Sequence, residues 1–518
     1  MNFLRHKITL ICISILLIGV MFLHLNSINW KGLFYFHGDN VTLALALKSI
    51  LTGEPFKWVF SSQLFIFPEG ILYAISYLVS QDYKSALLIN AYINIGLIFL
   101  GAYYLVGYLR IKGGSAYNFF IILSCLFLIS FSSESVPDIN YKSISTLIMF
   151  NTYYGGVIIV SIFQLFLVLS ITKSNPKYFW PKSSFFALCG ALCYASDPLY
   201  LLQFLIPLIA LLFLLLLLDR SRYFWLSTKI IFISAISLSL GHLLRYTLRD
   251  HWSASVGSYI GFSKVGIALH NLLGVIVGLQ SSPIYLFLWA LWACLLLLMG
   301  WRFCYLIRHR NSSQEWLMDY LVIGFLFSAS ILSSLGVILT GNFLTRYFLP
   351  VPIFSIIGGA LAIIGFSNKL IIKLIIIILL MGSAGFSYFT YSNSMMTETT
   401  VESDIRCYQK FVNELKIHAV GGFWTSRALD LYGNENSRVF QVTKDFHPYN
   451  WLSNRNDYSR FELSGVIVDN EPGTININES DVLILGTPTE TQNCQRFKIH
   501  AYAKGTLGFK TLNERMTQ

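Results

Sequence analysis

Residues 34–40 read FYFHGDN and hold two groups suited to acid–base chemistry, His37 and Asp39. They follow the first hydrophobic segment, where a membrane helix would meet water. A carboxylate at such a boundary can act as a general base that takes the proton from an acceptor hydroxyl. Because ionisable groups are unfavourable beside lipid, we interpret Asp39 as the centre of a site. The structural alternative is that Asp39 caps a short helix beginning near Val41.

Cationic residues recur at the ends of later hydrophobic segments. Arg346 and Tyr347 open the segment RYFLP, and His242 and Arg245 lie near the end of an earlier segment. Arginine can hold a phosphate leaving group by paired, charge-assisted hydrogen bonds and stabilise its developing charge. Either arginine could instead extend to the lipid headgroups. The histidines lack an HExxH-like spacing and predict no metal site.

Two further acids are candidates for the same chemistry. Asp138 follows a hydrophobic segment, and Asp197 stands in SDPLY, where Pro198 interrupts a long apolar run. Asp197 could equally form a turn or a helix cap. We expect the loop acids to be solvated unless they belong to the site. These loop acids are Glu54, Glu69, Glu134 and Asp138.

The composition indicates the elements that must position these residues. Of 518 residues, 55% are hydrophobic and 12% are charged, whereas soluble domains carry about 25% charged residues. Between Ile8 and Phe389, apolar runs of about 17–25 residues recur, each long enough to cross a bilayer. Residues 392–518 have ordinary polar composition. The sequence therefore predicts a polytopic membrane domain, 1–391, and a soluble C-terminal domain, 392–518.

We expect about eleven transmembrane helices. The first segment has no small-residue cleavage site after it and is interpreted as an uncleaved anchor. A long first loop, 26–85, contains two short apolar helices near Val41–Leu51 and Gly70–Val79, which we place in the membrane interface. The expected spans are Ile8–Leu25, Ala86–Leu109, Ala116–Ile129, Ser145–Ile171, Ser184–Ala195, Leu199–Leu218, Ile230–Leu248, Pro283–Ile307, Tyr320–Leu339, Tyr347–Ile364 and Leu370–Phe389.

The net charge of +11 is distributed among short loops, so the positive-inside rule explains it better than nucleic-acid binding. This rule places the N-terminus in the cytoplasm and the first loop and C-terminal domain outside. Expected outside loops include Arg249–Val265, extending as far as Ser282. The basic residues assigned to the cytoplasmic side are Arg110, Lys112, Lys173, Lys177, Lys182, Arg220, Arg222, Lys229, Arg302, Arg308, Arg310, Lys369 and Lys373.

The C-terminal domain is predicted to be α/β. Asp404–Ile417 and Trp424–Tyr432 have helical patterns, whereas SRVFQV, SGVIVDN and SDVLILG have the character of strands. Cys407 and Cys494 bracket this domain, and we expect them to form a disulfide in an oxidising compartment. The other six cysteines lie in or beside apolar helices and are expected to act as small hydrophobic residues.

This layout resembles the GT-C class of membrane glycosyltransferases, which use polyprenyl-phosphate sugars as donors. The matching features are Asp39 in FHGDN, the interfacial helices after it, RYFLP, and a C-terminal domain containing GGFWTSRALDLYG and HPYNWLSNRNDY. The resemblance implies Asp39 as catalytic base, Arg346 and secondarily Arg245 as phosphate-binding cations, and inversion at the sugar carbon. Many members carry two adjacent acids where this chain has Asp39-Asn40. We therefore expect no metal or other cofactor, with a divalent metal as the alternative.

Within this class, the layout is most similar to bacterial enzymes that modify the O-antigen. Such enzymes take glucose from undecaprenyl phosphate outside the cytoplasmic membrane and imply a flippase and a polyprenyl-phosphate sugar synthase as partners. Trp424, Tyr449 and Trp451 could stack on an acceptor glycan or pack in a core. An O-antigen polymerase or ligase and a lipid or sugar flippase are the competing interpretations. The flippase is disfavoured because nearly all ionisable groups gather at one membrane face.

Overall fold

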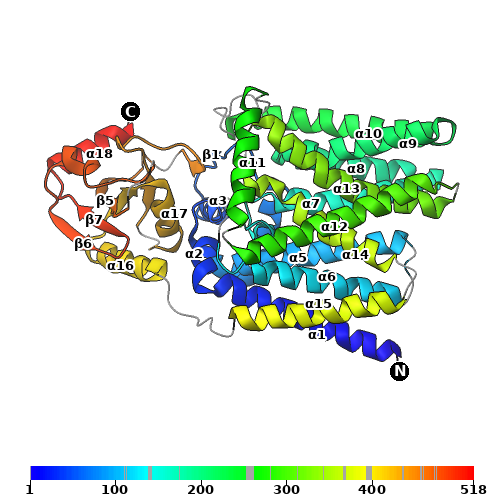
Figure 1. Cartoon of the computed structure of the whole chain (residues 1–518). Helices are drawn as coiled ribbons and strands as arrows, with labels where there is room; N and C mark the ends of the chain where they lie inside the picture. The colour runs from blue at the N-terminus through cyan, green and yellow to red at the C-terminus, as the bar shows by residue number, and fades with distance from the viewer. Residues whose placement is uncertain are drawn as a thin grey trace.

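The computed structural model describes residues 2–517 except 110, 112–113, 138–142, 174, 252–261, 281, 312, 342–343, 366–368, 392–399, 434–436, 456–457, 459, 472 and 474. The chain forms a helical bundle with a smaller domain at one end (Figure 1). We call this the domain end of the bundle. The N-terminus of α1 lies toward the opposite end, in agreement with the predicted topology. Asp138 lies outside the described residues.

Ten helical segments of the described chain are long and apolar enough to cross a membrane, so the protein is a multi-pass membrane protein. An eleventh helix, α8 (Phe179–Ser196), packs against α7 and α10 but begins with Lys182 and two serines, which lower its hydrophobicity. The ten correspond to α1 (Asn2–Asn26), α5 (Tyr83–Tyr108), α6 (Gly114–Ser133), α7 (Gly155–Thr172), η4–α9 (Leu201–Leu205, Ile206–Leu218), α10 (Arg220–Thr247), α12 (Pro283–Arg308), α13 (Gln314–Thr340), η7–α14 (Thr345–Phe348, Pro350–Ile364) and α15 (Lys369–Tyr391).

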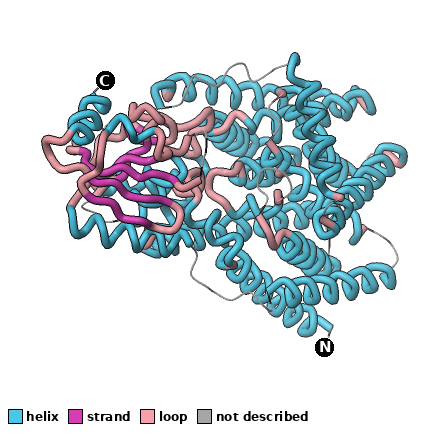
Figure 2. The backbone as a smooth tube through the Cα atoms, turned by 60° about the vertical axis from the view of Figure 1, so that its left-hand side comes forward, coloured by secondary structure: helices cyan, strands magenta, loops and turns pink. Residues whose placement is uncertain are grey.

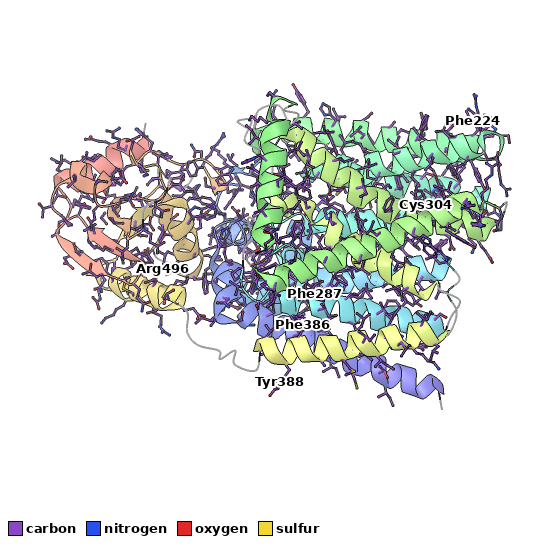
Figure 3. All side chains as sticks on the ribbon, viewed as in Figure 1. Phe224, Phe287, Cys304, Phe386, Tyr388 and Arg496 are labelled. Atoms are coloured by element: carbon purple, nitrogen blue, oxygen red, sulfur yellow. A yellow bond between two sulfur atoms is a disulfide. The ribbon has the colours of Figure 1, made fainter. Side chains whose placement is uncertain are left out.

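The outer surface of the bundle is apolar, as contact with lipid requires. Leu297 and Met381 are both 72% exposed, and Tyr388 is 77% exposed. Near the domain end, the rings of Phe287 on α12 and Phe386 on α15 stack with their centroids 5.6 Å apart (Figure 3). In a bilayer such side chains would face hydrocarbon, where their exposure is favourable.

The prediction of one helix over Ser145–Ile171 is wrong. A 3-10 helix covers Ser145–Met149, and α7 begins only at Gly155 because Tyr154 has left-handed backbone angles (φ 68°). Gly156 explains part of this break. A Cβ there would lie 2.3 Å from the carboxyl carbon of Glu69, so the start of α7 approaches another segment too closely for a side chain. The break brings residues 150–154 to the domain end.

Short helices cover the domain end of the bundle. The two predicted in the first loop are confirmed as α3 (Thr42–Leu51) and α4 (Ile71–Ser80), and α2 (Ile28–Phe36) precedes them. In the region of the other expected outside loop, Arg249–Val265 with Ser282 as its alternative end, a further short helix, α11 (Val265–Leu279), follows. α11 crosses the ends of the long helices at a steep angle (Figure 1).

The C-terminal domain is α/β, as predicted. Its five-stranded sheet has the order β3-β2-β5-β7-β6, and β2 runs parallel to both β3 and β5. Figure 2 shows the strands grouped together with helices around them. The elements are α16 (Thr400–Leu415), β2 (His418–Gly421), α17 (Phe423–Tyr432), β3 (Val439–Gln441), β5 (Leu463–Asp469), β6 (Glu490–Asn493), β7 (Phe497–Ala501) and α18 (Leu507–Thr517).

The segment SDVLILG is not a strand. Asp481–Leu485 form a 3-10 helix instead. Val482 and Leu485 are buried, whereas Leu483 and Ile484 are 77% and 51% exposed. Burial at a spacing of three residues suits a 3-10 turn, whereas a strand would bury alternate residues.

The two domains are joined by main-chain and ionic contacts. β1 (Trp58–Val59) of the first loop pairs antiparallel with β4 (Ser453–Asn454) of the C-terminal domain. At one side, Lys31 and Lys84 lie 2.6 and 2.7 Å from the carboxylate of Glu402. At the other, Arg438 lies 2.8 Å from Asp430 and also pairs with Glu54. Glu54 is thus a docking residue, and the expectation that it is solvated is wrong.

The predicted disulfide between Cys407 and Cys494 is present and links α16 to the turn between β6 and β7. Replacing both cysteines by serine should lower the stability of the C-terminal domain by about 2–5 kcal/mol, because the unfolded chain regains entropy. Thermal unfolding of the purified protein, with and without reductant, measures the change. Cys304→Ser, at a free and exposed cysteine of α12 (Figure 3), should leave the midpoint unchanged. Equal midpoints for all three proteins would contradict the prediction.

Candidate active site

Asp39 and Arg346 form an ion pair at the domain end. Arg346 Nη1 lies 3.5 Å from Asp39 Oδ2, and the two side chains are 27% and 13% exposed. Asp39 does not cap α3. The N-cap residue of this helix is Val41, and no side-chain hydrogen bond caps it. Asp39 Oδ1 is buried without a hydrogen-bond partner among the described residues. The hydrogen-bonding capacity of the carboxylate is therefore not fully used within this part of the chain.

The guanidinium of Arg346 is surrounded by three tyrosine rings. Its central carbon lies 5.6 Å from the ring centroid of Tyr153 and 5.9 Å from those of Tyr154 and Tyr347. Such rings favour a cation through their π faces. The Nε atom of Arg346 is buried and, among the described residues, has no acceptor. The ring arrangement therefore orients the cation, and a guanidinium held in this way can form paired hydrogen bonds with an anionic ligand.

Both residues line a cavity of about 510 Å³ between the bundle and the C-terminal domain. This is within the range of ligand-binding sites. Polar side chains from five separate segments of the bundle line it, together with Trp451 and Leu452 of the C-terminal domain. The lining residues are Asp39, Ser61, Ser62, Gln63, Phe65, Thr152, Tyr154, Asn271, Gly341, Leu344, Arg346, Tyr347, Trp451 and Leu452.

His37 lies beside this cavity in a supporting position. Its Nδ1 is 3.2 Å from the hydroxyl of Tyr153, and its ring lies 4.6 Å from that of Trp424. Burial lowers the pKa of His37, and the nearby cations Arg346 and Arg427 lower it further, although Asp39 opposes them. His37 is therefore neutral at pH 7, and it joins Tyr153 to the C-terminal domain.

Asn40, which stands where many GT-C enzymes have a second acid, has a structural role. It is fully buried, its Oδ1 accepts a hydrogen bond of 2.8 Å from the N–H of Asn151, and its amide donates to the carbonyl of Phe34. The carbonyl of Asp39 accepts a hydrogen bond of 2.9 Å from the hydroxyl of Thr152. Residues 151–152 therefore hold the loop that carries Asp39 in place.

The remaining predicted site residues do not line the cavity. Asp197 is buried and accepts a hydrogen bond of 2.9 Å from the N–H of Leu199, as a turn residue would. Arg245 donates to the carbonyls of Ala195, at 3.1 Å, and Ser62, at 2.5 Å, and so lies behind the cavity wall. His242 is exposed on α10. Tyr449 and the partly exposed Trp424 lie next to the cavity, around Phe423.

Two other acids expected in solvent are buried. The carboxylate of Glu134 accepts three backbone hydrogen bonds, from Ile144, Ser145 and Thr146, at 2.7 to 2.9 Å. It therefore anchors the segment that leads to Thr152. Glu69 is 3% exposed and lies against Gly156 at the start of α7.

Glu69 and Asp197 should make stability depend on pH. Burial raises the pKa of Glu69 to about 8, with the charge of Asp197 as the second cause, and burial raises the pKa of Asp197 to about 7. The folded protein thus keeps protons that the unfolded chain releases near pH 4, so stability is lost as the pH rises from about 4 to about 8. We expect a lower thermal midpoint at pH 8 than at pH 5.

The change Glu69→Gln should reduce this difference between the two midpoints by at least about 2 °C. Glu462→Gln is the matched control, because Glu462 is 68% exposed and pairs with Lys504 at the surface. An unchanged difference in Glu69→Gln would show that this carboxyl does not titrate in the folded protein.

Thr152, Tyr153 and Tyr154 lie inside the predicted transmembrane helix Ser145–Ile171, so the hydrophobic pattern does not mark them as site residues. The signal that could have found them is the segment NTYYGG, 151–156, in which an asparagine and two glycines flank the aromatic residues. Such clusters are typical of turns.

This arrangement is the GT-C fold: a multi-span bundle with an acid in the first loop, short helices across the same end, and a C-terminal domain over them. No family model matches the chain, and no curated protein matches its sequence. The crystal structure of ArnT from Cupriavidus metallidurans bound to undecaprenyl phosphate matches with a TM-score of 0.57 and 10% identity, over 96% of this chain and 98% of that chain. ArnT from the same organism in the apo state matches with a TM-score of 0.56 and 10% identity, over 95% and 97%.

Proposed function

We propose that this protein is an inverting glycosyltransferase. It transfers a hexose, glucose being the first candidate, from an undecaprenyl-phosphate sugar to the O-antigen of lipopolysaccharide or another cell-surface glycan. The observation that carries the proposal is the pair Asp39–Arg346 in a cavity at one end of a GT-C bundle. One oxygen of the carboxylate and one N–H of the guanidinium have no partner among the described residues.

The reaction follows from these two groups. The carboxylate of Asp39 takes the proton of an acceptor hydroxyl, and the oxygen forms a bond to the anomeric carbon of the sugar. The bond from that carbon to the phosphate oxygen breaks, and polyprenyl phosphate leaves with the electron pair. Arg346 stabilises the charge that develops on the phosphate. Because attack and departure occur on opposite faces in one step, the anomeric configuration inverts.

The donor class is supported by the position of the cavity and by the fold. The cavity opens where the bundle meets the C-terminal domain, so a lipid chain could remain among apolar helices while its phosphate reaches Arg346. One of the similar structures, ArnT, holds undecaprenyl phosphate.

The acceptor would enter from the side of the C-terminal domain. Trp451 lines the cavity, and Trp424 and Tyr449 lie nearby, so aromatic faces are available to sugar rings. Under the positive-inside rule this side is periplasmic, in a bacterial cytoplasmic membrane. A polyprenyl-phosphate sugar synthase and a flippase would then have to supply the donor there.

Radiolabel transfer in membranes tests the proposal. Membranes from cells that lack a polyprenyl-phosphate sugar synthase, with or without the wild-type chain, receive labelled undecaprenyl-phosphate glucose, a labelled nucleotide sugar, or a labelled pyrophosphate-linked oligosaccharide. We expect label in endogenous glycan from the first donor only. Transfer from the oligosaccharide alone would indicate an O-antigen polymerase or ligase. Movement of the lipid-linked sugar across liposomes without transfer would indicate a flippase.

A further inference from the structure

The C-terminal domain contacts the loop of Asp39 through α17. Gly38 lies so close to this helix that an added Cβ would be 3.0 Å from Phe423 Cε1, 3.2 Å from Trp424 Cε3 and 3.3 Å from Arg427 Cδ. Residue 38 is therefore glycine because of close approach, and the loop has little space in which to move away from α17. The orientation of Asp39 thus depends on residues more than 380 positions later in the chain.

Arg427 makes the polar part of this contact. Its Nε donates to the carbonyl of Gly38 at 2.8 Å, and its Nη2 donates to the hydroxyl of Thr42 at 2.8 Å. Its Nη1 donates to Gln441 Oε1 at 3.2 Å and to the carbonyl of Leu452. One guanidinium therefore connects residues on both sides of Asp39 with two segments of the C-terminal domain.

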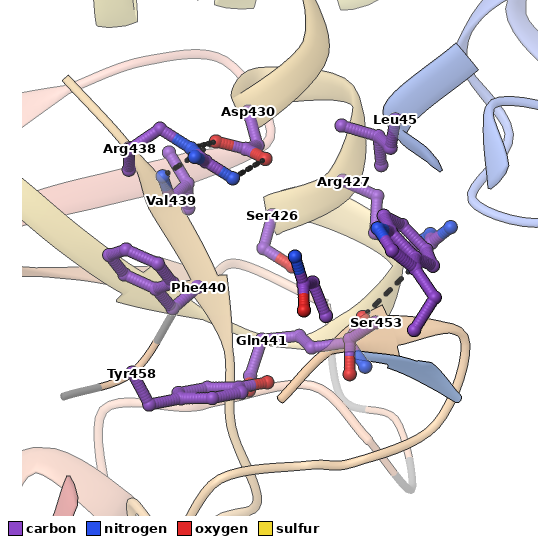
Figure 4. A pocket seen from close by; sticks show the side chains of 12 residues that line it. Leu45, Ser426, Arg427, Asp430, Arg438, Val439, Phe440, Gln441, Ser453 and Tyr458 are labelled. Atoms are coloured by element: carbon purple, nitrogen blue, oxygen red, sulfur yellow. Dashed lines mark hydrogen bonds and ion pairs between the residues drawn. The ribbon is translucent and has the colours of Figure 1, made fainter. Parts of the chain in front are cut away.

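This guanidinium does not line the cavity shared by Asp39 and Arg346. It lines a separate space of about 30 Å³ between α3 and the C-terminal domain, together with Asp430 and Arg438 (Figure 4). Arg427 is only 3% exposed. It therefore has no path to a substrate in the larger cavity and can act on the reaction only through the loop.

Arg427 carries a buried positive charge close to Asp39. Burial lowers the pKa of Arg427 to about 10, while Asp39 and Asp430 favour its charged form. The side chain is therefore a buried cation at pH 7, near a carboxylate that it does not contact directly. The other titratable or charged groups that act on Asp39 or are acted on by it are His37, Tyr153, Arg346 and Tyr449.

We propose that Arg427 is a positioning residue of the transfer reaction, which holds Asp39 in place through Gly38 and Thr42. The C-terminal domain then forms part of the catalytic centre, in addition to any contact with the acceptor. This inference rests on the proposed function. It predicts that loss of the Arg427 contacts lowers kcat more than it changes KM for the donor, because the loop that carries Asp39 is displaced while Arg346 remains.

The experiment compares kcat and KM in Arg427→Gln, Arg427→Lys and the wild type. Arg427→Gln should lower kcat about 100-fold, as expected for a small misplacement of a catalytic group, with little change in KM for the donor. Arg427→Lys keeps a cationic donor that can replace only some of the contacts of the guanidinium, so kcat should recover in part.

Arg438→Gln is the matched control for domain docking. Arg438 is also buried and belongs to the same domain, but it pairs with Asp430 and Glu54 and does not contact the loop of Asp39. Its loss should lower the thermal midpoint while kcat per folded molecule stays near the wild-type value. Thr42→Val provides a variant outside the C-terminal domain, and it should show a smaller loss of kcat than Arg427→Gln.

Three outcomes would overturn the inference. The first is wild-type kcat in Arg427→Gln. The second is an equal loss of kcat in Arg427→Gln and Arg438→Gln, which would reduce the role to docking. The third is a raised KM for the donor with unchanged kcat in Arg427→Gln, which would place the role in donor binding and not in the position of Asp39. An inactive wild type with every lipid-linked sugar would instead contradict the proposed function.

Discussion

Asp39→Asn should reduce glycosyl transfer by about 10³-fold or more, since general-base catalysis typically contributes 10²–10⁴ and no other carboxylate among the described residues lines the cavity. The amide has nearly the shape of the carboxylate but cannot accept a proton at neutral pH. Binding of undecaprenyl phosphate should change little, because the cation Arg346 remains. Initial rates with purified enzyme, together with equilibrium binding of the lipid phosphate, measure both effects.

Asp250→Asn is the matched control for this change. Asp250 follows α10 directly, its side chain is 87% exposed, and it pairs with Arg249 rather than with the site. We expect wild-type transfer in this variant. Full activity in Asp39→Asn, at equal expression, would leave Asp39 with a structural role. The search for a base would then pass to Asp197, which is buried behind the cavity, or to Asp138.

Arg346→Gln should have the second largest effect, a loss of about 10²–10³ in kcat, because a preorganised donor that stabilises a developing anion contributes this much. Affinity for undecaprenyl phosphate should fall as well. Arg346→Lys should recover only part of the activity, since an ammonium cannot form the paired contacts of a guanidinium. The three tyrosine rings around the planar cation should favour lysine less than arginine.

Arg249→Gln is the control for removal of a cation at the same end of the bundle. The side chain of Arg249 is 60% exposed and does not line the cavity, so its loss should leave both kcat and lipid binding unchanged. If Arg346→Gln retained wild-type affinity and rate, the phosphate would have to be held by other groups. Arg245 would not be an obvious replacement, because its guanidinium already donates to two main-chain carbonyls.

Hydrophobic runs predicted the membrane helices well because the bilayer imposes one length on every span. That Asp39 and Arg346, 307 residues apart, belong to one site is implied by the resemblance in layout. Their ion pair could not be predicted, because no local pattern determines which helix ends meet. The break before α7 was missed because Ile144, Leu147 and Ile148 are as apolar as a transmembrane helix. Their 3-10 turn depends on Glu134, a residue from another segment.

The roles of the buried acids and of Arg427 could not be predicted for the same reason. Glu54, Glu69 and Glu134 each stand between predicted helices, where a loop is expected. Glu69 and Glu134 are buried by contacts with residues 144–156, and Glu54 by its ion pair with Arg438 of the C-terminal domain. Arg427 lies on a helix whose position was predicted correctly. Its partners Gly38 and Thr42, however, belong to the first loop, so only the tertiary structure shows the contact.

An experimental structure with undecaprenyl phosphate tests most directly the role of the cavity that contains Asp39 and Arg346. The prediction is that the phosphate lies in this cavity in contact with the guanidinium of Arg346, with the lipid chain directed toward the bundle and Asp39 on the opposite side of the space that the sugar would occupy. A phosphate bound elsewhere, for example at Lys173 and Lys182 in the groove at the opposite end of α7, would contradict it.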